Sequence, residues 1–125
     1  MIVNANANDV SGTHLDLLWS SGSVGSSMNN EIVAINTLGY EVICIQFIVV
    51  SGTSMCCSEM IPVESSIDYT ILATHSHNKT LYSRGFTITA DGIEFAMSSE
   101  KNLSNNEVFW PTSIHMVPYR IYGMR

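Results

Sequence analysis

Two histidines stand one residue apart in the stretch THSHN, at His75 and His77. In an extended strand, side chains at positions i and i+2 point to the same side, so these two imidazoles could bind one transition-metal ion. A complete site needs another ligand, which His115 or Asp68 could supply if the fold brought either one close. The spacing therefore allows a metal site at His75 and His77, although a polar strand end without a metal explains the same residues.

The three cysteines indicate reduced thiols rather than a disulfide framework. Cys56 and Cys57 are adjacent, a spacing that seldom forms a bridge of normal geometry, and the chain has no Cys-X-X-Cys pair. We expect both thiols in a loop. Cys44 falls inside an apolar run and is expected to be a small buried side chain. These features indicate a protein made in a reducing cytoplasm.

Motifs for covalent or acid–base catalysis are weak. The sequence has no Gly-X-Ser-X-Gly nucleophile elbow. Glu64 and Asp68 could be compared with the carboxylate pair of a glycoside hydrolase, yet the 11 Asp and Glu residues are scattered along the chain. We therefore predict that the protein is not an enzyme and needs no cofactor.

Aromatic side chains offer a possible binding surface for sugars. An aromatic ring presents a flat apolar face and loses little side-chain entropy on binding. Trp110, which stands beside Pro111 and a polar stretch, is the first candidate for an exposed ring, and Tyr82 in NKTLYSRG is the second. The alternative is that both rings pack in the core.

Composition limits the classes of partner. With 125 residues the chain is long enough for one domain, which we place at residues 13–125 after a polar lead-in at residues 1–12. The net charge of −6, with only five Lys and Arg, argues against nucleic acid and against an anionic membrane surface. The longest apolar run, residues 42–50, is too short to span a membrane.

The pattern of apolar residues predicts an all-β fold. No window has apolar residues at helical spacing over three turns, and short β-branched runs are separated by Gly, Ser and Asn. We predict an antiparallel β-sandwich of about seven or eight strands with jelly-roll-like topology. The strands are expected at residues 15–19, 31–38, 40–50, 67–75, 86–97, 107–111 and 114–124, with loops at residues 20–27, 51–59 and 98–106.

The stretch FTITADGIEFAM predicts a hairpin. Asp91 and Gly92 suit the two central positions of a type I′ turn, both of which need a positive φ. This turn would pair Thr89 with Glu94, and Ile88 with Phe95, and would place Phe86 and Met97 on the face that carries Ile88.

Two strands carry apolar residues where a free monomer would show polar ones. The run at residues 40–50 is apolar on both alternating sets, so the face turned away from the core needs a cover. The tail also keeps apolar residues to its end, and Pro118 restricts that strand to a sheet edge or a bulge. With 46% hydrophobic and 13% charged residues, burial against other copies is expected. The expected interface residues are Val42, Ile48, Tyr119, Ile121 and Met124.

Several motifs together resemble a known family. They are Leu18-Trp19, Gly39-Tyr40 at the start of the apolar run, Arg84 ahead of TITADGIEF, and the terminal stretch PYRIYGMR. From residue 15 onward the chain is similar to small C-terminal domains of receptor-binding tail-fibre and baseplate proteins, from phages and prophages of Gram-positive bacteria.

This resemblance implies a virion protein of the phage tail, made in the bacterial cytoplasm. It implies a trimer that contacts other tail proteins and binds a host cell-wall polysaccharide, and it implies no catalytic residue. The loops around residues 55–60 and 74–80 differ from the family pattern, so no ligand follows from it. Two alternatives stay open: a monomeric carbohydrate-binding module, and a small β enzyme with a metal held by histidines.

Overall fold

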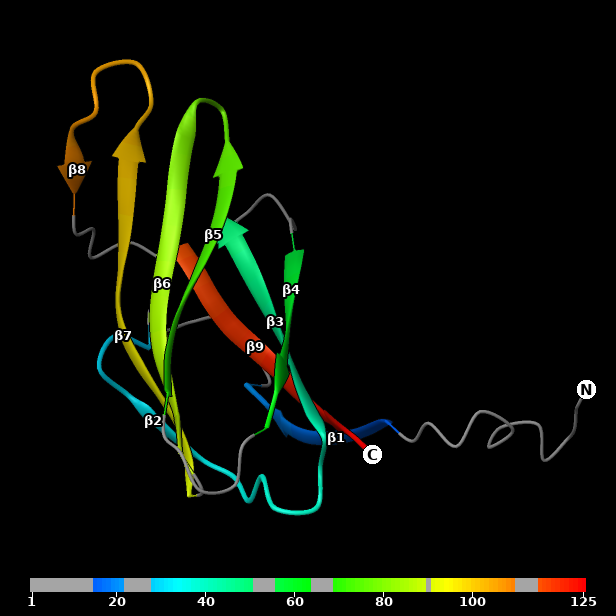
Figure 1. The fold of residues 1–125 in the computed structure, drawn as a ribbon. Coiled ribbons are helices and arrows are strands. Elements are labelled where there is room, and N and C mark those ends of the chain that lie inside the picture. The colour runs from blue at the N-terminus through cyan, green and yellow to red at the C-terminus, as the bar shows by residue number, and fades with distance from the viewer. Residues whose placement is uncertain (1–14, 22–27, 51–55, 64–68, 90, 110–114) are drawn as a thin grey trace, which may run out of the picture.

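The computed structural model describes residues 15–21, 28–50, 56–63, 69–89, 91–109 and 115–125. The lead-in at residues 1–12, the loop at 22–27 and Trp110 lie outside the described residues. The remainder forms two antiparallel sheets packed face to face, which confirms the predicted β-sandwich (Figure 1).

Nine strands build the two sheets of the described chain. The first sheet has the order β1-β9-β3-β4, and the second has the order β2-β7-β6-β5, with β8 paired to β7. Their bounds are β1 Leu15–Ser20, β2 Ile32–Ala34, β3 Val42–Val50, β4 Cys56–Pro62, β5 Tyr69–His77, β6 Thr80–Thr89, β7 Gly92–Asn102, β8 Val108–Phe109 and β9 His115–Met124.

The last strand lies inside the first sheet. β9 pairs with β1 on one side and with β3 on the other, so both rows of its backbone groups are used. Pro118 is opposite Phe47, next to a register shift between Gln46 and Phe47 that leaves Tyr119 as the extra residue. The prediction of a bulge at Pro118 is therefore confirmed. The alternative, that this strand lies at a sheet edge, is wrong, because β9 is paired on both sides.

Three segments differ from the sequence-based prediction. The strand expected at residues 31–38 is limited to Ile32–Ala34, and the chain then turns at Leu38 and Gly39, where Gly39 has a φ of 87°. Cys56 and Cys57 begin the edge strand β4 instead of lying in a loop. β7 continues to Asn102 because its polar residues pair with β6 on one side and β8 on the other.

The β6–β7 hairpin forms, but with a different register. Thr89 pairs with Gly92, Ile88 with Ile93, and Phe86 with Phe95, so the partners differ by two residues from those predicted, although Phe86, Ile88 and Phe95 share the buried face as expected. A register shift between Arg84 and Phe86 brings Ser98, opposite Arg84, to that face, so the predicted placement of Met97 is wrong. Gly92 lies within the strand, and a Cβ added there would run into the carbonyl oxygen of Val33. Close packing by β2 therefore explains this glycine better than turn geometry does.

The turn with two positive φ angles occurs one hairpin earlier. Asn78 and Lys79 have φ values of 50° and 60°, and they link β5 to β6 where His77 pairs with Thr80. This is the φ signature of a type I′ turn, which suits the twist of a tight hairpin.

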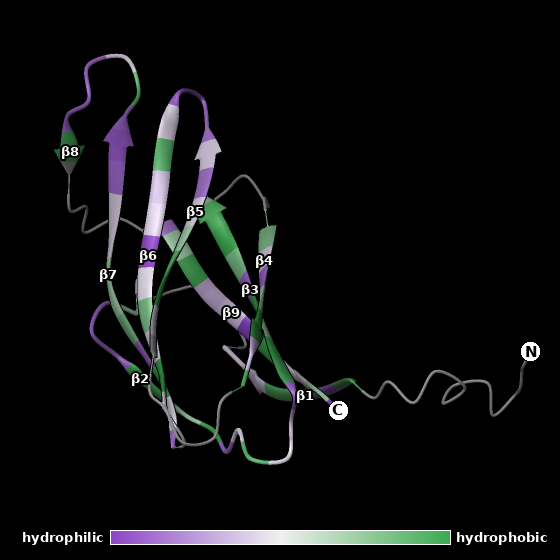
Figure 2. Ribbon diagram, in the orientation of Figure 1, coloured by the Kyte–Doolittle hydropathy of each residue, from purple (hydrophilic) through white to green (hydrophobic). Residues whose placement is uncertain are grey.

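Apolar side chains from both sheets fill the space between them. Ile43, Ile45, Phe47 and Val49 have no exposed surface, and the ring of Phe47 meets those of Phe86 and Phe95 at centroid distances of 6.0 and 6.3 Å. Figure 2 shows β3 as hydrophobic over most of its length. The predicted alternation along β3 is thus confirmed on the side that faces the core.

One charged side chain shares this core. Arg84 has no exposed surface and follows the inward set of β6, with Tyr82, Phe86 and Ile88. Its guanidinium donates to the carbonyl oxygens of Met116 at 3.0 Å and Ala96 at 2.6 Å, and to Oδ1 of Asn29 at 3.1 Å. Burial lowers the pKa of Arg84 to about 10, so it stays charged near neutral pH.

Candidate functional site

The outer face of the first sheet carries two complete rows of apolar side chains. Cross-strand pairing places one row of four residues across all four strands, and a second row lies beside it. We call this set the apolar face, and its members are Leu15, Met124, Val42 and Pro62, then Leu17, Tyr122, Cys44 and Met60. Leu15, Leu17 and Met60 are each more than half exposed, at 55%, 56% and 60%. No member is charged.

A polar row borders the apolar face, and further apolar residues follow it. The row consists of Ser20, Arg120, Gln46 and Ser58. Beyond it, Ile48 is opposite Cys56, and the Tyr119 hydroxyl lies 3.4 Å from the Cys56 sulfur. The outer surface of this sheet therefore presents little charge.

Four of the five predicted interface residues belong to this outer surface. Val42 and Met124 are in the apolar face, and Ile48 and Tyr119 lie beyond the polar row. Ile121 does not belong with them, because it points into the core and has no exposed surface. The register shift between Leu17 and Trp19 places Ile121 opposite Trp19, on the inner side. Ile121 is therefore a packing residue and cannot contact another copy.

The cysteines lie in strands and differ in exposure. Cys56 is exposed, whereas Cys44 and Cys57 are half-buried. Burial raises the pKa of Cys57 to about 11, with Glu59 and Cys56 adding to the effect, and burial also raises the pKa of Cys44. A raised pKa disfavours the thiolate, which is the form that binds metals and attacks disulfides.

The predicted metal ligands His75 and His77 lie at the end of β5, next to the turn that leads into β6. Both are half-buried on its inner side, and the His77 Nε2 lies 3.1 Å from the Asn78 amide nitrogen. Within the described ranges, no three His, Cys, Asp or Glu side chains lie close enough together to hold a metal ion. Two further ligands were suggested from sequence. Asp68 lies outside the described residues, and His115 stacks on Tyr82 and lies 3.8 Å from Glu100.

The predicted sugar-binding rings are not available as expected. Tyr82 is only 8% exposed, and its ring is stacked on His115 at 4.9 Å with an angle of 15° between the planes. Its inward position follows from the alternation of β6, so it does not offer a free face. Trp110 lies outside the described residues.

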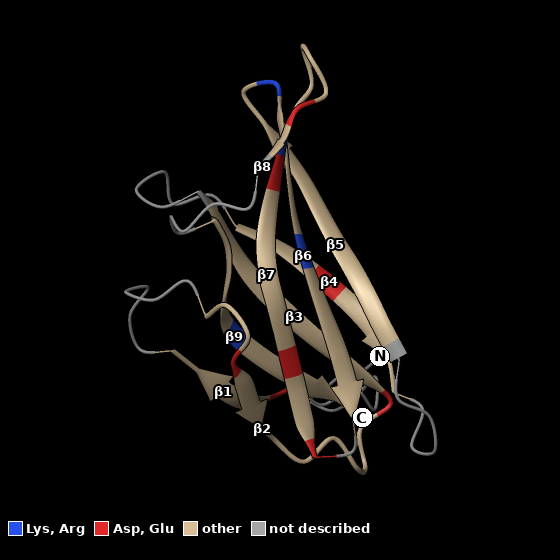
Figure 3. Cartoon of the chain, turned by 90° about the vertical axis from the view of Figure 1, so that its left-hand side faces the viewer, with Lys and Arg blue, Asp and Glu red and all other residues tan. Residues whose placement is uncertain are grey.

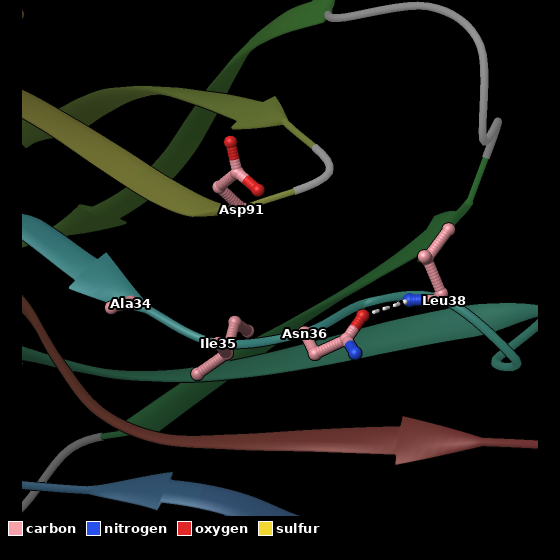
Figure 4. Close-up of a pocket in the computed structure, with 5 residues that line it drawn as sticks. All are labelled: Ala34, Ile35, Asn36, Leu38 and Asp91. Carbon is pink, nitrogen blue, oxygen red and sulfur yellow. Dashed lines mark hydrogen bonds between the residues drawn. The ribbon is translucent and has the colours of Figure 1, made fainter.

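The sequence did not predict a groove along the stretch that follows β2. Figure 4 shows its first part, where Asp91 of the β6–β7 hairpin and the Ala34–Leu38 stretch line two sides of a hollow of about 410 Å³. A second hollow of about 380 Å³ shares Ala34, Ile35, Asn36 and Leu38, and it extends to Leu18, Tyr40 and Arg125. Four residues line both hollows, so the two lie against the same stretch of chain, and we refer to them together as the groove.

The polar groups of the groove are held by local bonds. The Asn36 side-chain oxygen accepts the Leu38 amide at 2.9 Å, which leaves the Asn36 amide nitrogen able to donate (Figure 4). At the far end, the Tyr40 hydroxyl and the Arg125 guanidinium both donate to Oδ2 of Asp16 at 2.7 Å. The Arg125 guanidinium also lies over the Tyr40 ring, 4.7 Å from its centroid.

This end cluster fixes the carboxyl-terminal residue against β1. The Tyr40 ring packs on Gly123, where an added Cβ would lie 2.5 Å from Cδ1 of the ring. The bond to Asp16 raises the pKa of Tyr40, and the same carboxylate raises the pKa of Arg125. The sequence signals were the Gly-Tyr pair and the terminal Arg, although no pattern in the sequence linked them to Asp16.

Comparisons of the chain with protein-family models, with curated proteins and with solved structures gave no significant match. Across the described ranges, no helix combines the length and the hydropathy that a bilayer crossing requires.

Proposed function

We propose that this chain is a structural domain of a phage or prophage tail, in a tail fibre or baseplate, and that it assembles as a trimer through the apolar face. The observation that carries the proposal is the pair of uncharged rows across β1, β9, β3 and β4. The resemblance of the terminal PYRIYGMR motif supports the assignment to a tail protein.

Physical arguments favour another copy as the cover of this face. A contiguous exposed apolar surface with a polar border is typical of an interaction site. Two chains that each carry a net charge of −6 repel one another, so the least costly contact is a surface without carboxylates. The apolar face meets that condition, and Arg120 in the bordering row adds no negative charge.

The trimer is tested by placing a carboxylate in the apolar face. We expect the unmodified chain to form assemblies whose mass in sedimentation is a multiple of three times 13.7 kDa, and Met60→Glu to remove them. Leu103→Glu is the matched control, because Leu103 is 48% exposed and lies in the turn after β7, a strand of the other sheet. A Met60→Glu protein that keeps the three-chain mass would contradict the proposal.

The groove is the best-supported place for a host-surface glycan. It combines an apolar wall at Leu38, which is 54% exposed, with an amide donor at Asn36 and a carboxylate acceptor at Asp91. Since Asp16 neutralises Arg125, the groove favours a neutral sugar over an acidic one. The same chemistry would serve the alternative of a monomeric carbohydrate-binding module.

A glycan array and a titration with host cell-wall polysaccharide test this role. We expect Asn36→Ala and Asp91→Ala each to weaken binding at least tenfold, with Asn105→Ala in an exposed turn as the control. Loss of binding on Trp110→Ala alone would assign the ligand to the aromatic site suggested by the sequence. A one-chain mass together with binding would favour the monomeric module. Elemental analysis for transition metals tests the remaining alternative, an enzyme using His75 and His77.

A further inference from the structure

The edge strand β5 is long and regular. It runs from Tyr69 to His77 and pairs with β6 through nine consecutive residue pairs without a register shift. It ends its sheet, so in the part of the chain that the structure describes no strand pairs with its other side. An edge of this kind exposes a row of backbone N–H and C=O groups that can pair with another strand.

The other sheet edges carry features that hinder such pairing. β1 has Asp16 and a register shift, and β4 has Glu59 and ends in Pro62. β2 has three residues and β8 has two. β5 contains no Asp, Glu, Lys, Arg or Pro, and it is tan along its length in the charge view of Figure 3. Charged residues, prolines, bulges and short length are the usual protections of an edge, and β5 has none of them.

The outward side chains of β5 are symmetric about Leu72. Thr70 and Thr74 flank it two residues away on either side, and all three are exposed, Leu72 by 65%. Within the sheet Leu72 lies opposite Gly85, so the neighbouring strand supplies no side chain to cover it. An exposed leucine between two threonines is thus the centre of an outward-facing set of three side chains that is the same in both strand directions.

We propose that β5 pairs antiparallel with β5 of a second copy of this chain, with the twofold axis at Leu72. In this register Leu72 is opposite Leu72, and each Thr70 is opposite a Thr74. Aliphatic pairs and Thr–Thr pairs stabilise antiparallel strands, and no like charges oppose each other. The pairing would join two five-stranded sheets into one. Because the contact is the same surface on both copies, it closes after two chains.

This contact is separate from the apolar face, since β5 belongs to the other sheet. It therefore goes beyond the proposed trimer, and each contact can fail without the other. The low charge of β5 again favours a second copy, because chains of net charge −6 can approach at this edge without bringing carboxylates together.

The test measures the mass of Met60→Glu protein, in which the apolar face is disabled, by sedimentation at micromolar concentration. We expect twice 13.7 kDa, and a single chain once Leu72→Lys is added. Ile32→Lys is the matched control, because Ile32 is 67% exposed on β2, at the opposite edge of the same sheet. This variant should keep the two-chain mass. If Met60→Glu does not alter the mass, the proposed trimer contact fails, and Leu72→Lys alone then tests β5.

A second variant tests the register itself. In a Cys56→Ser background, Leu72→Cys should form a covalent dimer on oxidation with diamide, whereas Ile32→Cys should not. The proposal would be overturned if Leu72→Lys kept the two-chain mass, or if Ile32→Lys lost it. Equal crosslinking of the Leu72→Cys and Ile32→Cys variants would overturn it as well.

Discussion

Arg84 of β6 connects three other segments of the chain through hydrogen bonds. Its guanidinium binds carbonyl oxygens from β7 and β9 and the side chain of Asn29, which precedes β2. One of those carbonyls belongs to Met116, a non-glycine residue with a φ of 48°. The side chain therefore fixes an irregular start of β9 that apolar packing alone would leave without hydrogen-bond donors.

We predict that Arg84→Ala lowers the free energy of unfolding by about 3–5 kcal/mol, because buried acceptors lose their donor and a cavity forms. Arg84→Lys should cost about 2–4 kcal/mol, since a single ammonium cannot reach the same acceptors. Urea unfolding measures both, with Arg120→Ala as the exposed control. Equal midpoints for Arg84→Ala and Arg120→Ala would show that these bonds contribute nothing net.

The cysteines should differ in reactivity with pH. At pH 8 a thiol with a pKa of about 11 is ionised in about one molecule in a thousand, so Cys57 should alkylate far more slowly than the exposed Cys56. Intact-mass measurement after timed iodoacetamide treatment of the Cys56→Ser and Cys57→Ser variants, which share the same Cys44, distinguishes the two. Similar labelling rates in the folded protein would contradict the burial of Cys57.

The raised pKa of Cys57 should make the folded protein less stable as the pH rises into the alkaline range. The folded-state pKa of Cys57 lies above its ordinary value of 9.0, so the folded protein holds the proton more tightly than the unfolded chain. Its contribution to stability is complete below about pH 9 and is lost as the pH rises through about 11. Cys57→Ala should reduce this loss of stability in urea unfolding between pH 8.5 and 10.5.

At this scale the sequence predicts burial well where strict alternation holds. The inward residues of β3, and Phe86 and Ile88 of β6, follow from it. The buried position of Arg84 was not predicted, although Arg84 continues the same alternation. Tyr82 was placed wrongly because its polar neighbours in the sequence were given more weight than that alternation. The link between Arg125 and Asp16 was out of reach, because it joins residues whose approach depends on the order of the strands.

At the scale of elements, the β6–β7 hairpin separates what a turn motif fixes from what packing fixes. Alternation correctly predicted that Phe86, Ile88 and Phe95 share a face, but it could not predict the register shift that puts Ser98 there instead of Met97. The motif Asp91-Gly92 predicted the wrong partners, since Gly92 lies where β2 pairs with β7 and leaves no room for a Cβ beside the Val33 carbonyl. A strand of three residues gives too weak a pattern for that contact to be foreseen.

Two glycine substitutions test this explanation. Gly92→Ala places a Cβ against the backbone of Val33 and should cost about 1–3 kcal/mol, because a backbone atom cannot move aside as a side chain can. Gly85→Ala is the control, since its Cβ would meet the Ala96 Cβ at an ordinary 3.7 Å. Thermal unfolding compares them, and equal melting temperatures would assign Gly92 no packing role.

For the whole molecule, the two outer surfaces differ in character. The first sheet presents the apolar face, whereas the second presents Thr70, Thr74 and Ser76 from β5 and Glu94 from β7 among its exposed residues. The sequence predicted two sheets and a strand with apolar residues on both sides. It could not predict the strand order that gathers Leu15, Val42, Met60 and Met124 into one surface.

Association should depend on salt in a direction set by this distribution. Chains of net charge −6 repel at a distance, while the proposed contacts are uncharged. Raising NaCl from about 10 mM to about 500 mM shortens the Debye length from about 30 Å to below 5 Å and should strengthen association. Sedimentation at the two salt concentrations measures the association. Weaker association at high salt would indicate contacts held by ion pairs instead.

The interior position of β9 has a consequence for synthesis of the protein. β1 and β3 have no direct pairing with each other and are joined only through β9. The ribosome makes about a hundred residues after β1 before β9 emerges, which takes several seconds at about 5–20 residues per second. During that time the nascent chain holds two unjoined strands with apolar sides. Formation of the first sheet therefore has to wait until β9 has been made.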